Sequence, residues 1–554
     1  MADCRLNNQL LFLTIFLYFV YSSIFKIFHL SLILYIYNYS GNNLKQETII
    51  IFDYGSQYTR LISRRLRENN VFCDLVSPNI DPKFFKDRKI KGFILSGGPN
   101  SVYDNSAPKI PEWILDYDIP ILGICYGMQL IAQAFNGKVE KTQNREYGDA
   151  VLRIKKESNL FENIPPSNKV WMSHSDKIIT LPEKFIATAE TNNTFCAAFE
   201  KDNIFGVQFH PEVDNTNLGD EILSNFALKV CKVKNNWTSK NFIQNSIAHI
   251  RDEVGNKNVI CAISGGVDSS ITATLIHRAI GEQLTSIFVN NGLLRKNEEH
   301  DVMNFLKNDL GLNVHLYDAS NQFLEKLKNI TDPEKKRKII GAEFINVFEK
   351  ESKKIKNVEF LAQGTLYSDV VESAIIKDGH QVVIKSHHNV GGLPEKMNLK
   401  LIEPLRLLFK DEVREIGEEL GINKNIIGRH PFPGPGLAIR IMGEITETKL
   451  SILRESDHIF IEELKKSNIY DDIWQAFAVL TDTQSVGVMG DNRTYQHCIA
   501  IRAVNSKDAM TADWSKIPYE ILSKISSRII NEVDGINRVV YDITSKPPST
   551  IEWE

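Results

Sequence analysis

Ser264-Gly-Gly-Val-Asp-Ser-Ser270 is the stretch that decides how most of this 554-residue chain folds. An apolar, β-branched run at 259–263 precedes it and a helical run at 271–280 follows it, so the pattern predicts a buried parallel strand, a tight turn and a helix. The two glycines allow the turn to close with its N–H groups directed at the helix N-terminus, which makes a cradle for an anion. Asp268 by itself would repel a phosphate there, and it therefore implies a bridging Mg²⁺.

The loop lacks the Gly-Lys-Ser/Thr ending of a Walker A motif, which argues against phosphoryl transfer at this site. It resembles instead the pyrophosphate-binding loop of the N-type ATP pyrophosphatases, which adenylate a substrate oxygen and release pyrophosphate. The resemblance implies an ATP site formed by the whole loop, namely Ser264, Gly265, Gly266, Val267, Asp268, Ser269 and Ser270. The alternative, a strand-to-helix turn with serine caps, needs fewer special residues than this loop contains.

A second chemical motif lies upstream, in Ile121-Leu-Gly-Ile-Cys-Tyr-Gly-Met-Gln-Leu130. An apolar strand leads into Gly-x-Cys-x-Gly and then into a helix, a pattern that holds a nucleophile on a strained, exposed turn. Cys125 is expected at the helix N-terminus, where the helix dipole favours the thiolate. A thiolate nucleophile needs a base and a group that orients the base. His210 and Glu212 point the same way at the end of an extended segment and can supply both.

A glycine-rich turn, Leu95-Ser-Gly-Gly-Pro-Asn-Ser101, follows an expected strand at 92–95. Its main-chain amides, with Gly98 as the candidate donor, and the amide of Tyr126 are predicted to form an oxyanion hole. Taken singly, each piece has an ordinary explanation, because a lone buried cysteine is usually a small hydrophobic residue. Together, and in this order, the pieces resemble the class I (triad) glutamine amidotransferases over about residues 47–233.

The amidotransferase resemblance also implies how glutamine is held. Gln129 would line the pocket, Ser173 and His174 would contact glutamine through their main chain, and Asp176 would bind its ammonium group. His174 is a rival candidate for the catalytic base. We assign that role to His210 because only His210 has a carboxylate two residues away on the same face.

The C-terminal 200 residues indicate which acceptor is used. Five stretches, at 360–373, 384–394, 429–440, 486–491 and 544–554, resemble the glutamine-hydrolysing GMP synthase family, and the resemblance runs from about residue 47 to residue 554. It implies an enzyme that hydrolyses glutamine to ammonia, adenylates xanthosine monophosphate (XMP) with ATP and aminates it to GMP. Two alternatives are another adenylating ligase such as NAD synthetase and a non-catalytic nucleotide and glutamine sensor. The cysteine elbow argues against the first, and the retained nucleophile and base argue against the second.

By the same resemblance, the XMP site would contain Arg337, Pro433, Gly434, Pro435, Gly436, Gln475, Lys546 and Glu552. Asp369, Glu372 and Lys385 would serve the adenylated intermediate or Mg²⁺. Lys385 with His387 and His388 would place up to three cationic donors beside the phosphate cradle, although a solvated loop is the alternative for the two histidines. Lys336 and Lys338 are expected on a solvated face. The sequence departs from the family pattern at Asn290, where aspartate is usual, and at Ser368, where proline is usual.

Composition limits the class of protein. The net charge of −4 and the pI near 6.4 give no footprint for nucleic acid or anionic membranes. Seven scattered cysteines have no metal-type spacing and are typical of a reducing cytoplasm. The segment from Leu10 to Tyr37 is long and apolar enough to span a bilayer, and it has no small-residue cleavage site of the signal-peptide type. It is either an artefactual or dispensable extension or a real membrane tether.

We therefore predict an α/β protein with four parts. These are a hydrophobic extension (1–46), a glutamine amidotransferase domain (47–233), a doubly wound parallel-sheet ATP pyrophosphatase domain (234–428) and a small α+β domain (429–554). The resemblance implies that the last part dimerises and completes the XMP site. The polar stretch at 232–240 is expected to be a linker. The expected ligands are L-glutamine, ATP, XMP and Mg²⁺, in a cytoplasmic homodimer that has no nucleic-acid partner and meets a membrane only if 10–37 is a real segment.

Overall fold

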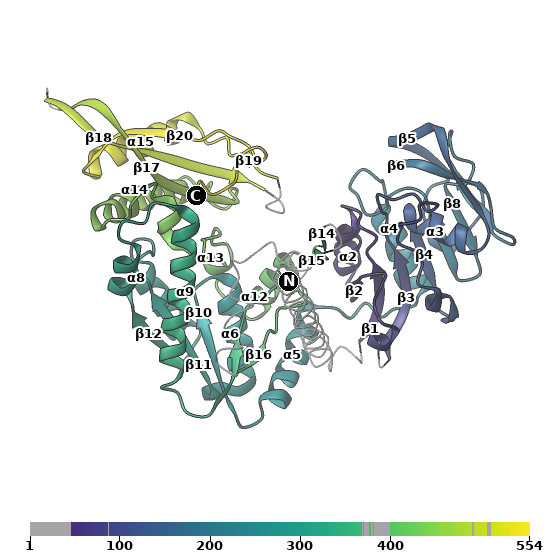
Figure 1. Cartoon of the computed structure of the whole chain (residues 1–554), viewed down its shortest axis with the longest axis horizontal. Helices are drawn as coiled ribbons and strands as arrows, with labels where there is room; N and C mark the ends of the chain where they lie inside the picture. The colour runs from purple at the N-terminus through teal and green to yellow at the C-terminus, as the bar shows by residue number, and fades with distance from the viewer. Residues whose placement is uncertain are drawn as a thin grey trace, which may run out of the picture. The chain divides into compact units, whose positions relative to one another are not determined.

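The computed structural model describes residues 46–86, 88–367, 369, 376–377, 380–381, 399–489, 492–506 and 511–554. The chain divides into two compact units, Met1–Asn241 and Phe242–Glu554, whose elements are labelled in Figure 1. The apolar segment at 10–37 lies outside the described residues. Among the described residues, no helix is both long enough and apolar enough to cross a membrane.

The first unit contains a nine-stranded sheet in the order β2-β1-β3-β4-β9-β8-β7-β5-β6. The strands from β2 to β9 on this path run parallel, and the rest pair antiparallel. Their bounds are β1 (Glu47–Phe52), β2 (Cys73–Val76), β3 (Lys89–Leu95), β4 (Ile121–Ile124), β5 (Lys138–Ile154), β6 (Ser167–Thr180), β7 (Ile186–Glu190), β8 (Ala198–Lys201) and β9 (Ile204–Val207).

The parallel strands of this sheet are buried on both faces, which is why they are continuous apolar runs. In β1, Ile49 and Ile51 enter one core with helices α2 (Thr59–Glu68) and α4 (Gly219–Ser224). Ile50 and Phe52 enter the core on the other face, where helix α3 (Tyr126–Ala134) packs. The first unit is therefore a sheet covered by helices, with its parallel strand ends available for a site.

Strand β4 passes into helix α3 with a single residue between them, Cys125, whose φ is 53° and ψ is −104°. A side chain rarely adopts this left-handed region, so the main chain is strained at the cysteine. Two glycines make the turn possible. A Cβ on Gly127 would lie 2.2 Å from the main-chain oxygen of Leu95, and one on Gly123 would lie 2.6 Å from the main chain of Gly127.

The second unit begins with a five-stranded parallel sheet in the order β12-β11-β10-β13-β16. The strands are β10 (Asn258–Ile263), β11 (Leu284–Asn290), β12 (Val314–Asp318), β13 (Val358–Ala362) and β16 (Lys400–Ile402). Helix α6 (Val267–Ile280) leaves the end of β10 and packs on β10 and β11, and helix α9 (Pro333–Ser352) packs on β11. The predicted strand, turn and helix around Ser264–Ser270 are thus confirmed, at the carboxyl end of the central strand.

Five further helices lie in this part of the described chain: α5 (Ser239–Val254), α7 (Glu298–Asn304), α8 (Ser320–Leu327), α12 (Lys410–Glu419) and α13 (Lys424–Ile427). A short β14–β15 pair (Ile376–Lys377 and His380–Gln381) stands apart from the sheet.

The C-terminal part of the second unit is a small mixed sheet with a long antiparallel hairpin, β17 (Gln475–Met489) and β18 (Asn492–Asn505). Strands β19 (Asp513–Trp514) and β20 (Ile536–Tyr541) pair with β18. Alternate residues of β17 enter different cores: those at 476 and 478 pack with helices α14 (Glu447–Lys466) and α15 (Tyr519–Glu532), and those at 477 and 479 pack with the segment that ends the chain.

The stretch at 232–240, predicted as a linker, is irregular but is fastened to the first unit. The main-chain N–H of Trp237 donates to Asn70 O at 2.9 Å, and the indole packs under the guanidinium of Arg67 at 4.5 Å. The stretch therefore has ordered contacts up to the start of α5.

Replacing Gly127 with alanine is expected to destabilise the first unit by about 2 kcal/mol or more, because the new methyl group must displace main-chain atoms of Leu95. Gly341→Ala is the matched control. Gly341 lies within α9 with nothing within 4 Å of an added Cβ, so alanine there should stabilise the helix by up to about 1 kcal/mol. Calorimetric unfolding of both variants checks this, and an unchanged unfolding temperature for Gly127→Ala would contradict the close approach.

Candidate active sites

Cys125, His210 and Glu212 lie at the adjacent ends of two paired strands, β4 and β9. The N–H of Cys125 donates to Val207 O at 2.8 Å, which brings the segment after β9 to the cysteine. His210 Nδ1 is 2.7 Å from Glu212 Oε1, and both side chains are buried. The ring of Tyr58 packs edge-on against the His210 ring, with centroids 5.1 Å apart. The imidazole is therefore held in one orientation, with its Nε2 left for the thiol side.

The electrostatics of His210 favour its protonated form. Burial alone would lower the pKa of His210, but the Glu212 carboxylate and the Cys125 sulfur outweigh burial and raise it well above its ordinary value. An imidazolium next to the thiol favours a thiolate. The arrangement can therefore supply a nucleophile and a proton donor together.

The predicted oxyanion-hole residues meet at the same place. The N–H of Gly127 donates to Ser96 O at 3.1 Å, which ties the glycine-rich turn to the start of α3. A Cβ on Gly97 would lie 3.0 Å from His210 Cε1, and one on Gly98 would lie 3.2 Å from the Tyr126 ring. The turn thus lies between the imidazole and the helix N-terminus that carries Tyr126.

The predicted glutamine-binding residues come from α3 and β6. The Cys125 sulfur is 3.8 Å from Ser173 O, and Gln129 Nε2 donates to Asp176 O at 3.0 Å. The buried carboxylate of Asp176 accepts hydrogen bonds from Ser101 Oγ at 2.6 Å and Tyr103 OH at 3.2 Å. The structure brings all four predicted residues to the cysteine side of the sheet.

The reason for preferring His210 over His174 needs a correction, because Asp176 lies two residues after His174 in β6 and His174 also faces a second carboxylate. Its Nε2 is 3.4 Å from Glu146 Oε2, which comes from β5 and not from a neighbour in the sequence. The direction of Nε2 separates the two histidines. His174 Nδ1 donates to Asp176 O at 3.0 Å and its Nε2 faces Glu146, whereas His210 binds Glu212 through Nδ1 and turns Nε2 toward Cys125.

The ATP loop is closed by its own hydroxyl groups. Ser264 Oγ is 3.1 Å from Ser269 Oγ and accepts from the N–H of Gly266 at 3.3 Å. Gly265 has a φ of +71°, and a Cβ there would lie 2.6 Å from Val302. The loop therefore requires glycine at position 265. A turn whose main-chain N–H groups form an anion cradle commonly needs glycine in this way.

Asp268 carries a partner that sequence reasoning missed. Its two carboxylate oxygens lie 2.5 and 2.6 Å from Nζ of Lys410, the first residue of α12. A lysine in the first turn of a helix opposes the helix dipole, and this was the available signal. Lys410 neutralises this carboxylate, so Asp268 could serve as a carboxylate ligand of Mg²⁺ only if Lys410 moves away from it.

The segment after β13 borders the ATP loop. A Cβ on Gly364 would lie 3.1 Å from the main chain of Asp268, and the Asp369 carboxylate accepts from the N–H of Leu366 at 2.9 Å. The expectations for Ser368, Glu372, Lys385, His387 and His388 fall outside the described residues and stay predictions.

The departure at Asn290 has a structural consequence. Its side-chain amide donates to Glu299 Oε2 and its Oδ1 accepts from the N–H of Gly292 at 2.9 Å. Aspartate could not donate to Glu299, so asparagine replaces a carboxylate repulsion by a hydrogen bond.

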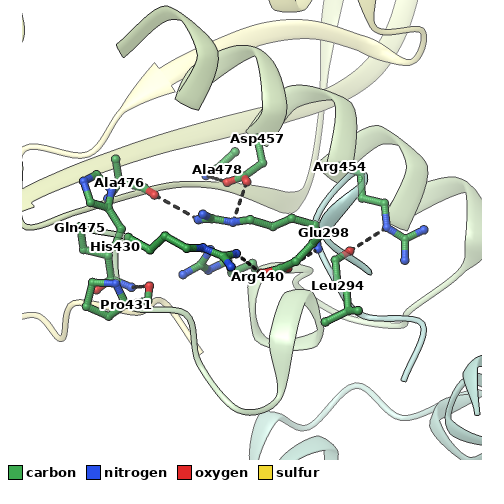
Figure 2. Close-up of polar contacts among 12 residues, drawn as sticks. Leu294, Glu298, His430, Pro431, Arg440, Arg454, Asp457, Gln475, Ala476 and Ala478 are labelled. Carbon is green, nitrogen blue, oxygen red and sulfur yellow. Dashed lines mark hydrogen bonds and ion pairs between the residues drawn. The ribbon is translucent and has the colours of Figure 1, made fainter. Parts of the chain in front are cut away.

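Three of the predicted XMP segments meet at Glu552. Gln475 Nε2 donates to Glu552 Oε1 at 2.8 Å and to Pro431 O at 3.1 Å. Arg440, fully buried, forms two contacts with Glu552 at 2.9 and 3.1 Å. Figure 2 shows Gln475 and Pro431 beside each other, with Arg440 reaching toward them. Arg440 ends the proline-rich stretch that the sequence singled out, but its charge was given no role there.

The proline-rich loop is fixed from two sides. Gly436, with a φ of +62°, would bring a Cβ within 2.5 Å of Leu293 O. The Phe432 ring lies under the guanidinium groups of both Arg295 and Arg440, at 5.1 and 5.2 Å. Arg295 also pairs with buried Asp457 at 3.0 Å, a residue labelled in Figure 2. The loop that carries Pro433 to Gly436 is thus held by charged residues the sequence did not reveal.

The expectation of a solvated Lys336 is wrong. Lys336 is fully buried, and its Nζ contacts Glu554 Oε2 at 2.6 Å and Ile441 O at 2.7 Å. Helix α9 packs this side against the segment at 436–441, and the acceptors replace the water shell of the ammonium group. Lys338 is exposed, as predicted.

The two remaining predicted XMP residues lie near the end of the chain. Arg337 pairs with Glu334 at 2.8 Å and donates to the main-chain oxygen of Glu554. Lys546 forms a main-chain bridge with Ala512, with bonds of 2.7 and 3.0 Å.

The sequence matches known protein families in three segments. Family models match residues 50–230 (glutamine amidotransferase class-I), 238–343 (NAD synthase) and 462–553 (GMP synthase C terminal domain). A "GMP synthase [glutamine-hydrolyzing]" of Dehalococcoides mccartyi (strain CBDB1) is 55% identical over 517 residues, which are 93% of this chain and 97% of the relative. The chain belongs to the glutamine-hydrolysing GMP synthase family.

Other known proteins are similar over the whole chain or over one part of it. The corresponding protein of Lactobacillus gasseri is 56% identical over 511 residues, 92% of this chain and 98% of the relative. A solved structure of a glutamine amidotransferase from Thermotoga maritima is 20% identical and covers 38% of this chain and 84% of its own, with a TM-score of 0.27. The NAD synthase match is confined to the segment with the ATP loop, so NAD synthetase does not describe this chain as a whole.

Replacing Glu212 with glutamine is expected to lower the pKa of His210, because the carboxylate is one of the groups that raise it. Glutamine hydrolysis should fall by roughly 10²–10⁴-fold, by analogy with other orienting carboxylates, and its alkaline limit should move to lower pH. Because the pKa of His210 is higher in the folded than in the unfolded protein, its protonation stabilises the fold. The stabilisation is complete below a pH of about 6.5, the unfolded-state pKa, and is lost as the pH rises through the folded-state pKa. The variant should lack that acid-side stabilisation.

The pH dependence of glutamine hydrolysis and of the unfolding temperature checks this expectation. Ammonia-driven GMP formation in the same variant is the control, since it does not use the thiol. An alkaline limit at the wild-type pH would show that Glu212 does not set the protonation of His210.

Proposed function

We propose that two chemically separate sites divide the work of this glutamine-dependent GMP synthase. The enzyme hydrolyses glutamine to ammonia, adenylates XMP with ATP, with release of pyrophosphate, and aminates the adenylated nucleotide to GMP. The proposed glutaminase lies in the first unit and the proposed adenylation site in the second. The buried contact between His210 and Glu212, beside a cysteine on a strained turn, is the observation that carries the glutaminase assignment.

In the glutaminase, Cys125 is the nucleophile, His210 the base and Glu212 the orienting carboxylate. The thiolate attacks the amide carbon of glutamine, His210 gives a proton to the leaving nitrogen, and ammonia departs as the thioester forms. Water then hydrolyses the thioester to glutamate with His210 as base. The N–H groups of Gly98 and Tyr126 would stabilise the oxyanion. Gln129, Ser173, His174 and Asp176 would hold the substrate.

In the adenylation site, the loop from Ser264 to Ser270 would bind the phosphates that leave as pyrophosphate. Lys410, paired with Asp268 at 2.5 Å, can turn toward a phosphate when a metal neutralises the aspartate. Mg²⁺ would be held by Asp268 with phosphate oxygens and would neutralise their charge. Asp369, Glu372 and Lys385 would contact the adenylated intermediate.

We place XMP at Arg337, Pro433, Gly434, Pro435, Gly436, Gln475, Lys546 and Glu552. The support is that four of the chain segments concerned meet in the structure: the proline-rich loop, β17, α9 and the last residues. Arginine and lysine suit the phosphate, and the loop glycines allow close approach to the base.

The three domains at 47–233, 234–428 and 429–554 and a homodimer are part of the proposal. The far end of the β17–β18 hairpin exposes Val486, Val488 and Tyr495, by 46, 75 and 66%, and Val486 pairs with Tyr495 across the strands. An exposed apolar face of this kind fits a second copy of the chain. A cytoplasmic location fits the free cysteines of the described residues, at 73, 125, 196, 231, 261 and 498.

Cys125→Ala should abolish glutamine-driven GMP synthesis and leave ammonia-driven synthesis, because only the glutaminase needs a thiolate. Asp268→Ala should remove synthesis from both nitrogen sources while Cys125 stays reactive, because the Mg²⁺ that would neutralise the phosphates loses its proposed protein ligand. AMP and GMP formation with each nitrogen source is the measurement. Glutamine use that persists in Cys125→Ala, or ammonia use that persists in Asp268→Ala, would refute the division.

Lys546→Ala should weaken XMP binding by about one to two orders of magnitude, the effect of losing one charged contact to a phosphate. ATP binding should change little. Calorimetric titration of the full chain with XMP and with ATP separates the two effects, and Lys338→Ala, which removes an exposed charge, is the control. Equal XMP affinity in Lys546→Ala and wild type would remove this residue from the nucleotide site.

A further inference from the structure

A continuous set of buried polar side chains leads from the Cys125 sulfur into the sheet. Gln208 Nε2 is 3.6 Å from the Cys125 sulfur, and Gln208 Oε1 accepts from Gln129 Nε2 at 3.2 Å. Gln129 Nε2 also donates to Asp176 O at 3.0 Å. The side chains of Gln208 and Gln129 are 0 and 3% exposed, so water does not compete for these bonds.

The donor and acceptor roles in these hydrogen bonds are fixed by the carbonyl at their end. Asp176 O is a main-chain carbonyl and can only accept, so Gln129 must present its NH₂ group there. That same group then donates to Gln208, which must present its oxygen. Gln208 is left with its own NH₂ group facing the cysteine, and it therefore acts as a donor to the sulfur and cannot accept the thiol proton.

The far end of the set is anchored by a buried carboxylate, that of Glu146. Asp176 O also accepts from His174 Nδ1 at 3.0 Å, and His174 Nε2 lies 3.4 Å from Glu146. Thr191 and Thr194 donate to the two oxygens of Glu146, each at 2.8 Å. Burial alone would raise the pKa of Glu146, but His174 and the threonine hydroxyls more than offset it and lower the pKa. The anchor is thus an ionised carboxylate, and its partner keeps Asp176 O in place.

The sulfur needs a donor on this side. The polar neighbour of the sulfur on β6 is Ser173 O at 3.8 Å. This oxygen is an acceptor, so it stabilises the thiol and disfavours the thiolate. His210, backed by Glu212, faces the sulfur from the segment after β9. Gln208, two residues before His210, contacts the same sulfur from that segment. Both residues therefore favour the charged nucleophile.

We propose that Gln208 is a catalytic residue of the glutaminase: its side-chain amide donates a hydrogen bond to the Cys125 thiolate, and the buried contacts that end at Glu146 fix that amide in the donating orientation. The proposal rests on the proposed role of Cys125. In this proposal Gln208 acts directly on the nucleophile Cys125. Glu146 is a positioning residue that acts through His174 and Gln129. The same amide can continue to donate when sulfur becomes the thioester sulfur and later the leaving thiolate, because its orientation does not depend on the proton of the cysteine.

Gln208→Glu is the sharpest test, because it keeps the shape and the bond from Gln129 and replaces the donor to sulfur by an acceptor that also carries a negative charge. We expect glutamine-driven kcat/KM to fall roughly 10- to 100-fold, the effect of one donor to a charged group. The pH at which iodoacetamide alkylates Cys125 at half its maximal rate should rise by about one unit or more. The modified peptide is quantified by mass spectrometry, and ammonia-driven synthesis should be unchanged.

Three further variants complete the experiment. Gln208→Met, of similar length and uncharged, should change both readouts in the same direction and gives an independent result if the glutamate variant does not fold. Glu146→Gln should give a smaller shift of the alkylation profile in the same direction. Gln133→Glu, which adds the same charge at an exposed position of α3, should change neither readout.

The failures of the two ideas can be told apart. Glutamine-driven synthesis that survives Cys125→Ala would overturn the proposed glutaminase site itself. If Cys125→Ala abolishes it, but folded Gln208→Glu or Gln208→Met keeps the wild-type alkylation profile and glutamine-driven kcat/KM, the Cys125 assignment stands and the role of Gln208 is overturned.

Discussion

Both chemical sites of this GMP synthase depend on one constraint: a helix must begin at the carboxyl end of a parallel strand with almost no connecting chain. The helix N-terminus then faces the strand ends, where its N–H groups and dipole favour negative charge. In the proposed glutaminase of the first unit this charge would be the Cys125 thiolate, and in the proposed adenylation site of the second unit it would be a phosphate. The constraint can be met only where a side chain is absent. A Cβ would lie 2.2 Å from Leu95 O if added to Gly127, and 2.6 Å from the Val302 side chain if added to Gly265.

The C-terminal segment that carries Lys546 and Glu552 has little regular structure, and buried cations hold it instead. Arg502 is fully buried and binds Ile551 O at 2.8 Å and Asp542 at 2.6 Å. Arg440 binds Glu552, and Lys336 binds Glu554. A buried cation without its acceptors would be strongly destabilising, so these contacts oblige the segment to occupy one place. The proposed XMP residues Lys546 and Glu552 therefore lie on a segment that buried charges hold in place.

Much of the fold followed from local patterns. The strand, turn and helix at both sites, the closeness of His210 to Glu212, and the proline-rich turn at 433–436 each involve residues within a few positions of one another. Their geometry is set by glycine, proline and the alternation of a strand. The expectations that needed correction concerned environment. Lys336 was expected on a solvated face together with Lys338, and nothing local reveals that α9 turns that one residue toward the segment at 436–441.

The sequence by itself determined which chemistry this protein carries, since the nucleophile elbow and the phosphate loop are encoded by residue types at fixed short spacings. Only the tertiary structure decided which distant side chains tune that chemistry. Lys410 meets Asp268 across 142 positions, Gln208 meets Cys125 across 83 and Arg440 meets Glu552 across 112. The physical reason is that spacing along the chain fixes the backbone path locally, whereas the partner that neutralises or orients a buried group is chosen by packing, which brings together whichever element can satisfy it.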